Sequence, residues 1–298
     1  MELISDTKTL LDANYSQMRT RFDSESGILW TLLDQDAVPC VTPDLLSELQ
    51  HHHEAIETSG GQLWIGEQPC NVRYSVMASL TPGVFNLGGQ LSLFRELIRA
   101  KNRDALLHYG VECIKVLFPR INHFYLPLTT IALVQGDALG GGLEGVLVSD
   151  VVIAERGAQM GFPEILFNLF PGMGAYSLLA RKVGTAVAEK MMLSGKIYAA
   201  EELHAMGVVD VLAEPGAGVQ AVYDYVKKQE RRANGFMAVQ QVRQRFNPVT
   251  YEEMMDVVRI WVDAALRLTE KDLKVMDRFV RSQEKAFLHQ KEQEYLIA

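Results

Sequence analysis

The chain has 298 residues, of which 48% are hydrophobic and 22% are charged, and its formal net charge is -8 at pH 7. A chain of this length can bury a full-sized core, and its composition is that of a globular protein, which excludes intrinsic disorder. The excess of acidic residues argues against nucleic-acid binding, because proteins of that class carry surplus Lys and Arg to meet the phosphates.

The cysteines and the apolar patterning indicate a cellular compartment. The three cysteines, Cys40, Cys70 and Cys113, are widely spaced and form no CxxC pair, so we interpret them as small core residues in a reducing environment. Residues 1–20 lack the apolar stretch of a signal peptide, and no window approaches the roughly 18 apolar residues of a transmembrane helix. The sequence therefore predicts a cytoplasmic protein without a membrane span.

In chain order, the elements divide the sequence into three predicted regions. Residues 1–27 are polar and predict a helical or loose N-terminal arm, and residues 28–214 predict an α/β core. Its strands are expected at 28–33, 74–80, 129–135 and 151–154, and its helices at 43–57, 90–101, 104–117 and 143–149. Residues 215–298 predict a helical region that covers a pocket or makes subunit contacts. Its helices are expected at 219–232, 236–245, 251–268 and 272–285.

One segment couples a strand to a glycine-rich turn and a helix. Residues 131–135 lead through Gly140, Gly141 and Gly142 to Glu144. Consecutive glycines let the backbone approach a ligand, and free N–H groups at a helix N-terminus favour a developing oxyanion. The alternative is a structural role, in which the glycines only permit close helix–strand packing. The turn lacks the Lys-Ser/Thr ending of a phosphate loop and the GxGxxG pattern, which argues against nucleotide hydrolysis.

Two further segments carry features of a catalytic site. Glu164 follows Pro163 among apolar neighbours, which disfavour its charged form and suit proton transfer near neutral pH. Residues 84–91 form a second strand–turn–helix junction, with paired glycines at Gly88 and Gly89. The sequence thus predicts two carboxylates and two glycine turns that meet at one site.

These three segments, in this order and spacing, resemble those of the crotonase (enoyl-CoA hydratase/isomerase) superfamily over roughly residues 28–212. The resemblance implies a spiral of ββα units with a helical C-terminal region, assembled as a homotrimer or hexamer. It also implies an acid/base pair, Glu144 and Glu164, and an oxyanion hole made of the backbone N–H groups of Leu87 and Gly141. The substrate is expected to be an acyl thioester of coenzyme A or of acyl carrier protein. No cofactor and no metal is expected.

A narrower resemblance covers nearly the whole chain. The stretch FNLGGQLSLF, the loop 167–176 and the helix around Trp261 resemble the diffusible signal factor synthases of Gram-negative bacteria. Leu87 and Gln90 stand where many crotonases have Ala and Asp, and a backbone donor tolerates such a change. This resemblance implies dehydration of a 3-hydroxyacyl carrier-protein thioester to a cis-2-enoyl thioester. Hydrolysis would follow, releasing a free cis-2-unsaturated fatty acid for quorum sensing.

The predicted substrate-binding residues also permit a plainer interpretation. The residues expected to line an acyl pocket are Gly88, Gly140, Phe170, Met173 and Trp261. The last three could equally be plain core. The run His51-His52-His53 predicts a solvated surface rather than a metal site, because adjacent helical residues point in different directions and no Cys or carboxylate cluster completes a site.

Two alternative functions remain open from the sequence. An enoyl-CoA hydratase of fatty-acid β-oxidation would share both glutamates, so the motifs do not separate it from a signal synthase. A non-catalytic partner of a sensor histidine kinase is the other alternative, since synthases of this group are held by their sensors. The intact pair of Glu144 and Glu164 argues against a purely regulatory role.

Overall fold

The computed structural model describes the backbone of residues 13–297 and the side chains of this range except 286 and 288–297. The arm predicted for residues 1–27 lies partly outside the described residues. Its described part contains strand β1 (Met18–Asp23), so the prediction of a helical or loose segment is wrong there. The strand forms because β1 pairs antiparallel with β2 (Ile28–Leu33) across a turn, in which Asp23 accepts a hydrogen bond from the Ser26 hydroxyl.

The main sheet has six strands in the order β1-β2-β5-β7-β9-β12. The last four are β5 (Tyr74–Ser79), β7 (Thr129–Val134), β9 (Val151–Glu155) and β12 (Val211–Ala213). Every pair from β2 onward is parallel, and all residues of β7 are buried. Parallel strands that are covered on both faces have continuous apolar sequences, and for this reason the sequence pattern predicted β2, β5, β7 and β9.

A second sheet of four short strands lies in the order β11-β10-β8-β6, and of these the sequence pattern predicted only β6, as the strand of the junction at 84–91. They are β6 (Val84–Asn86), β8 (Asp137–Leu139), β10 (Gln159–Gly161) and β11 (Ile197–Ala199). Strands β6, β8 and β10 each follow a strand of the main sheet, so the chain repeats a ββα turn. At the corner between β7 and β8 a Cβ on Gly136 would clash with the Gly83 backbone, which is why glycine occupies this position.

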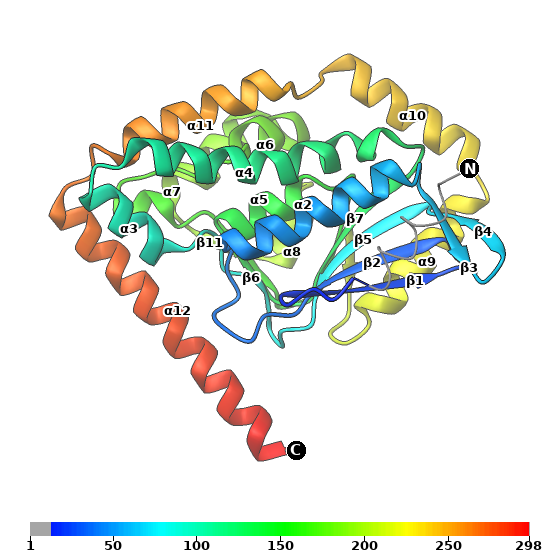
Figure 1. Ribbon diagram of the computed structural model, residues 1–298, viewed down its shortest axis with the longest axis horizontal. Helices are drawn as coiled ribbons and strands as arrows, with labels where there is room; N and C mark the ends of the chain where they lie inside the picture. The colour runs from blue at the N-terminus through cyan, green and yellow to red at the C-terminus, as the bar shows by residue number, and fades with distance from the viewer. Residues whose placement is uncertain (1–12, 298) are drawn as a thin grey trace.

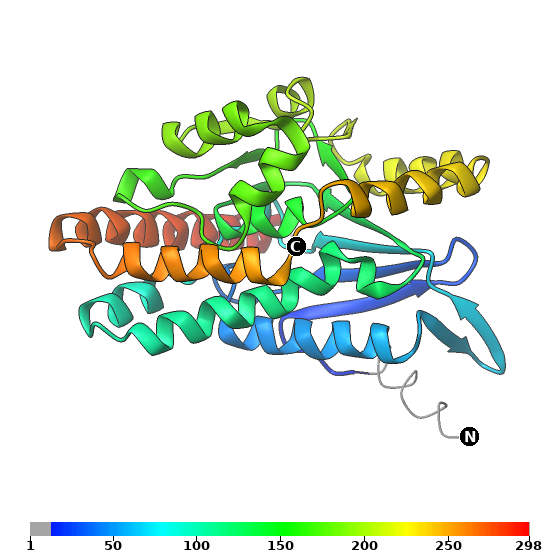
Figure 2. The same ribbon diagram turned by 90° about the horizontal axis from the view of Figure 1, so that it is seen from above.

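Helices cover one face of the main sheet in a layer. Figures 1 and 2 show α2 (Pro43–Thr58), α4 (Arg103–Ile121) and α11 (Tyr251–Ala265) side by side, and α4 contacts both of the others. Helix α5 (Gly141–Leu147) lies between this layer and the sheets. The large apolar core fills the same space.

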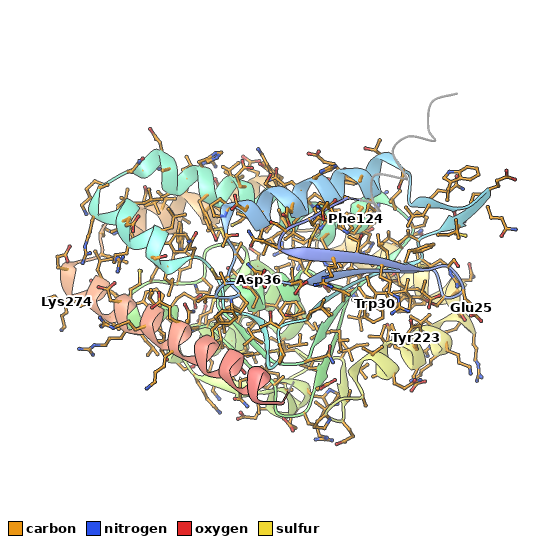
Figure 3. The ribbon with its side chains drawn as sticks, turned by 60° about the horizontal axis from the view of Figure 1, so that its bottom comes forward. Glu25, Trp30, Asp36, Phe124, Tyr223 and Lys274 are labelled. Carbon is orange, nitrogen blue, oxygen red and sulfur yellow. The ribbon has the colours of Figure 1, made fainter. Side chains whose placement is uncertain are left out.

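The other face of the sheet is covered by α9 (Gly218–Glu230), which contacts β7, β9 and β12. A second apolar cluster forms there, and the ring centroids of Trp30 and Tyr223 lie 6.2 Å apart at its edge (Figure 3).

The remaining elements are the hairpin β3 (Gln62–Ile65) and β4 (Gln68–Asn71), the short 3-10 helices η1 (His123–Tyr125) and η2 (Glu164–Phe167), and the helices α3 (Leu91–Arg99), α6 (Ala175–Val183), α7 (Thr185–Ser194), α8 (Ala200–Ala205), α10 (Ala233–Phe246) and α12 (Glu270–Ile297). Figure 1 shows the C-terminal turns of α12 extending beyond the body of the molecule, whereas the earlier part of this helix packs against α3 and η2. Among the described residues, no helix has both the length and the apolarity to cross a bilayer.

Two of the three adjacent histidines are buried, which corrects the prediction of a solvated surface. His52 Nε2 forms a hydrogen bond of 2.9 Å with Thr31 Oγ1. The ring of His53 packs edge-on against the ring of Phe124, with centroids 4.9 Å apart; Phe124 is labelled in Figure 3. Burial lowers the pKa of His52 to about 3 and the pKa of His53 well below its ordinary value, so both rings are neutral. Only His51 is exposed. The described residues contain no cluster of His, Cys, Asp and Glu that could hold a metal ion.

The cysteines follow the prediction in part. Cys40 and Cys113 are buried in the core, as expected for small apolar residues. Cys70 lies in the hairpin strand β4 and is only half-buried, so its interpretation as a core residue is corrected. All three are free thiols.

Candidate active site

A cavity of about 110 Å³ lies between α2, α4 and α5. Facing stripes of the two long helices line it. From α2 these are Leu45, Leu46, Leu49 and His53, and from α4 they are Tyr109, Cys113, Val116, Leu117 and Arg120. Glu144 and Glu164 line the same cavity together with Gly89 and Gly141. The fold therefore brings the two predicted carboxylates and both glycine turns to one mostly apolar space.

Glu144 is a buried carboxylate with fixed partners. Helix α5, which carries it, begins after Gly140, whose φ of 54° and ψ of -122° suit only glycine. The Glu144 side chain is 2% exposed, and its Oε1 accepts hydrogen bonds from the backbone N–H groups of Met173 at 2.7 Å and Ala175 at 3.1 Å. Burial raises the pKa of Glu144 to about 7, and these two hydrogen bonds oppose that rise.

The loop that holds Glu144 depends on two glycines. A Cβ on Gly172 would clash with the indole of Trp261, so glycine lets the loop pack against α11. Gly174 has a φ of 106°, a backbone conformation that other residues rarely adopt. These constraints explain the sequence Pro-Gly-Met-Gly, since the turn must present the N–H of Met173 and Ala175 to one carboxylate oxygen.

Glu164 is less anchored than Glu144. It begins the 3-10 helix η2 directly after Pro163 and is half-buried at the cavity wall. Its Oε2 has no hydrogen-bond partner within the described part of the chain. A Cβ on Gly140 would clash with Glu164 Oε1, which shows how closely the glycine turn approaches this carboxylate. Burial first, and the charge of Glu144 second, raise the pKa of Glu164 to about 8.

The backbone donors of the site differ from the prediction at one position. The N–H of Gly141 lies in the first turn of α5, where no intrahelical acceptor exists. The predicted second donor, Leu87, uses its N–H for a hydrogen bond to Pro39 O at 2.8 Å. The Gly89 N–H has no partner among the described residues, and a Cβ on Gly141 would lie 3.3 Å from its nitrogen. The second donor is therefore corrected from Leu87 to Gly89.

Neighbouring backbone fixes the direction of the Gly89 N–H. The Val41 N–H donates to Gly88 O at 2.7 Å. In a trans peptide the C=O and the N–H point in opposite directions, so the Gly89 N–H points away from Val41. Gly88 has a φ of 92°, and a Cβ there would lie 2.8 Å from Leu139 O. Glycine is thus required at 88 for the turn.

The C-terminal helix α12 also contacts this turn. Gln283 Nε2 donates to Leu87 O at 3.0 Å. Phe279, on the same helix, packs edge-on against Phe167 of η2, with ring centroids 5.6 Å apart. Helix α12 therefore contacts both Leu87, the residue before the paired glycines, and the 3-10 helix that carries Glu164.

Three of the five predicted substrate-binding residues line the cavity. They are Phe170, Met173 and Trp261, whereas Gly88 and Gly140 lie outside the lining. The indole of Trp261 is buried and packs edge-on against Phe94 at 5.1 Å. Met173 also contributes through its backbone, because its N–H donates a hydrogen bond to Glu144 Oε1.

Sequence reasoning missed four polar residues of the cavity lining: His53, Asn86, Tyr109 and Arg120. Arg120 is 2% exposed and donates to Ile131 O at 2.8 Å and to Ser75 Oγ at 3.1 Å, and burial lowers its pKa to about 10. The helix predicted over 104–117 ends before Arg120, whereas α4 continues to Ile121. Even within a predicted helix, an amphipathic pattern alone does not distinguish a buried charged residue from a solvated one.

The arrangement of ββα turns with a helical C-terminal region is the crotonase fold. The family model described as enoyl-CoA hydratase/isomerase matches residues 66–290, and the chain belongs to this family.

Curated relatives match shorter stretches. Methylglutaconyl-CoA hydratase of Rattus norvegicus is 32% identical over 152 residues, which are 51% of this chain and 46% of the relative. The mitochondrial protein of Arabidopsis thaliana named "Probable enoyl-CoA hydratase 2" is 30% identical over 194 residues, covering 65% of this chain and 59% of the relative. The chain thus spans about half the length of the curated relatives that it matches.

Solved structures share the fold at low sequence identity. DspI of Pseudomonas aeruginosa superimposes with a TM-score of 0.63 at 22% identity, covering 79% of this chain and 90% of DspI. The enoyl-CoA hydratase of Bacillus halodurans gives a TM-score of 0.70 at 21% identity, covering 88% of this chain and 100% of the other. At this level of identity the likeness concerns the fold alone.

Proposed function

We propose that this protein is a diffusible signal factor synthase. In this proposal it dehydrates a 3-hydroxyacyl carrier-protein thioester and then hydrolyses the product to a free cis-2-unsaturated fatty acid. One observation carries the proposal: Glu144 and Glu164, both with a raised pKa, line one apolar cavity beside the N–H groups of Gly89 and Gly141, which have no partner among the described residues. The resemblance of the FNLGG turn and of the loop at 167–176 to signal synthases selects this activity within the family.

The first step is the loss of water. The N–H groups of Gly89 and Gly141 bind the thioester oxygen and stabilise the enolate that forms when the α-proton leaves. Glu144 acts as the base, because two N–H donors favour its charged form. Glu164, whose pKa is the higher of the two, is protonated and gives its proton to the departing 3-hydroxyl. The products are a 2-enoyl thioester and one water molecule.

The second step uses the same groups for hydrolysis. A carboxylate takes a proton from water as the oxygen attacks the thioester carbonyl, and the two N–H groups hold the tetrahedral oxyanion. The C–S bond then breaks, and the carrier leaves as a thiol after gaining a proton. One water is released and one is consumed, so the net products are the free enoic acid and the carrier thiol.

The cavity also supports selection of the acyl chain by length. Its lining is mostly apolar, and each methylene buried there contributes about 0.8 kcal/mol to binding. The stripes of α2 and α4 lead to the polar pair His53 and Arg120. A methylene next to these polar groups contributes less binding free energy than one buried among apolar side chains. A medium chain that stops short of these two residues is therefore the preferred substrate in this proposal.

The proposal extends to partners and organisation. The acyl group is delivered by acyl carrier protein in the cytoplasm, the protein assembles as a homotrimer or hexamer, and a sensor histidine kinase is a candidate regulator. The helical region 215–298 supplies pocket cover and subunit contacts to the core at 28–214.

A CoA-dependent enoyl hydratase is the second candidate function. It is favoured by the names of the curated relatives, which include hydratases from rat and Arabidopsis thaliana. The same two carboxylates would add water to a trans-2-enoyl-CoA, and the thioester would stay intact.

Purified protein should be incubated with 3-hydroxyacyl thioesters of several chain lengths, on carrier protein and on CoA. Products are then separated by mass spectrometry and by cis/trans geometry. The proposal expects free cis-2-enoic acid from carrier-protein substrates and none from the Glu144→Ala protein. Accumulation of trans-2-enoyl thioester without free acid would refute it in favour of the hydratase. Equal turnover of CoA thioesters would overturn the carrier assignment alone.

A further inference from the structure

The side chain of Asn86 lies in the active-site cavity with an unused donor. Asn86 ends strand β6, is 2% exposed and lines the cavity together with Glu144 and Glu164. Its Oδ1 accepts the N–H of Gly88 at 2.9 Å. Only the oxygen of an amide can accept this N–H, so the orientation of the amide is fixed and the NH₂ group occupies the other position.

The NH₂ group of Asn86 has no protein partner. Its Nδ2 is buried and forms no hydrogen bond within the described part of the chain. Glu144 Oε1 is occupied by two backbone N–H groups, and Glu164 Oε2 has no partner, so neither of these oxygens accepts from Asn86. A buried donor without an acceptor destabilises a fold, and native proteins keep few of them. This donor therefore indicates an acceptor that a ligand supplies.

Asn86 packs beside the reacting groups. A Cβ on Gly142 would clash with Asn86 O and lie 3.2 Å from Asn86 Cβ, so Asn86 lies against the first turn of α5, next to Gly141. In a 3-hydroxyacyl thioester two oxygens lie near the scissile bonds. The thioester oxygen already has two backbone donors, at Gly89 and Gly141, which leaves the oxygen on C3.

We propose that Asn86 Nδ2 donates a hydrogen bond to the C3 oxygen of the substrate, and that Asn86 thereby selects 3-hydroxyacyl thioesters. The inference rests on the proposed substrate class. The C3 oxygen has two lone pairs, so it accepts from Asn86 on one and receives the proton of Glu164 on the other. When the C3–O bond breaks, its electron pair goes to the oxygen, which leaves as water. The Asn86 hydrogen bond strengthens as charge develops on that oxygen, because the donor is already oriented.

Two variants separate this donor role from a structural role. Asn86→Asp keeps the acceptor for the Gly88 N–H and loses the donor once it is ionised, at the upper end of the pH profile, whereas Asn86→Ala loses both. For each purified variant we would measure kcat/KM on a 3-hydroxyacyl carrier-protein thioester over the full pH profile. The inhibition constant of the saturated acyl thioester of equal length, which lacks the C3 oxygen, is measured in parallel, together with the melting temperature.

The proposal expects both variants to lose about tenfold or more in kcat/KM, the scale of one buried hydrogen bond, with little change in the inhibition constant. If Asn86→Ala loses activity while Asn86→Asp stays near normal, the role of Asn86 is instead to hold the Gly88 turn. If a variant weakens the binding of the saturated thioester as much as it lowers kcat/KM on the 3-hydroxyacyl thioester, the proposal is also overturned.

If the wild-type protein converts no 3-hydroxyacyl thioester, the proposed function fails on its own. The ratio of the dissociation constants for 3-hydroxyacyl-CoA and saturated acyl-CoA then decides the role of Asn86. An unchanged ratio in both variants refutes the role, and a ratio that falls toward one supports it.

Discussion

Helix α5 and the 3-10 helix η2 each present one glutamate to the same cavity, yet they hold it differently. Glu144 is 2% exposed and its Oε1 accepts two backbone N–H groups. Glu164 has one oxygen without a partner in the described part of the chain, and the charge of Glu144 adds to the effect of burial on the pKa of Glu164. The surroundings thus give the two glutamates different roles. Glu144, which is anchored by hydrogen bonds, is the better base, and Glu164 is the better acid. Because the two interact, their protons leave in two steps that belong to the pair.

The largest effect is expected from removing either carboxylate. Glu144→Gln or Glu164→Gln should each reduce product formation about 10²–10⁴-fold, the usual contribution of a positioned acid or base. The exposed Glu54→Gln on α2 is the matched control and should keep full activity. Product is measured by mass spectrometry on variants whose circular dichroism is native. Substantial turnover by either cavity variant would contradict a two-carboxylate mechanism.

Next in size is the loss of a backbone donor, which tests how far the two glutamates depend on the shared oxyanion site. Gly141→Pro and Gly89→Pro each remove one N–H and should reduce kcat about 10²–10³-fold. A Cβ on Gly89 comes within 2.6 Å of Phe94 Cζ, so Gly89→Ala is the control that has the crowding but keeps the N–H. Leu87→Ala should remain far more active than Gly89→Pro. Equal kcat for Gly89→Ala and Gly89→Pro would mean that this N–H is not a donor.

A smaller change sharpens the difference between the two carboxylates. Ala175→Pro removes one of the two N–H donors to Glu144, at the first position of α6, where proline is tolerated. Because this hydrogen bond lowers the pKa of Glu144, its loss should raise that pKa. Glu144 then needs a higher pH to ionise, so the acidic limb of the kcat/KM profile should move to higher pH. Ala175→Ser keeps the N–H and should leave the limb in place, and an unmoved limb in Ala175→Pro would show that another group controls it.

The smallest expected effect is on stability. The pKa of Glu164 rises to about 8 in the folded chain, from an ordinary value of about 4.3. Between these values the folded state binds more protons than the unfolded state, so stability should fall as the pH rises. Glu164→Gln removes this fall. Its melting temperature should exceed that of the wild type above about pH 8, but not below about pH 4. Scanning calorimetry at both pH values provides the measurement, and an equal difference at the two would refute it.

The carboxylates and the Gly141 donor were predictable because each stands in a contiguous motif, whereas the second donor was not. Which N–H is free at residues 87–89 depends on Pro39 and Val41, which are brought to the turn by the fold. A sequence pattern in one segment contains no information about such partners. Asn86 was missed for the same reason, since its significance lies in an acceptor that it lacks.

Part of the fold escaped prediction because its elements are short. Strands β8, β10 and β11 have three residues each, too few for an alternating pattern to be recognised. Strand β6 is equally short, and only the glycine turn that follows it indicated a strand there. The long helices and the buried parallel strands were found because their apolar spacing extends over several turns or over a whole strand. His52 and His53 were misjudged because residue type was weighed more heavily than their place on the apolar face of α2.

The hydrogen bond from Gln283 to Leu87 O has a consequence for the order in which the molecule is completed during synthesis. It joins residues that are 196 positions apart. Ribosomes add about 5–20 residues per second, so roughly 10–40 s separate the synthesis of the two partners. Both carboxylates are made within this interval. A growing chain therefore contains the acid and the base before the oxyanion turn has received its last anchor.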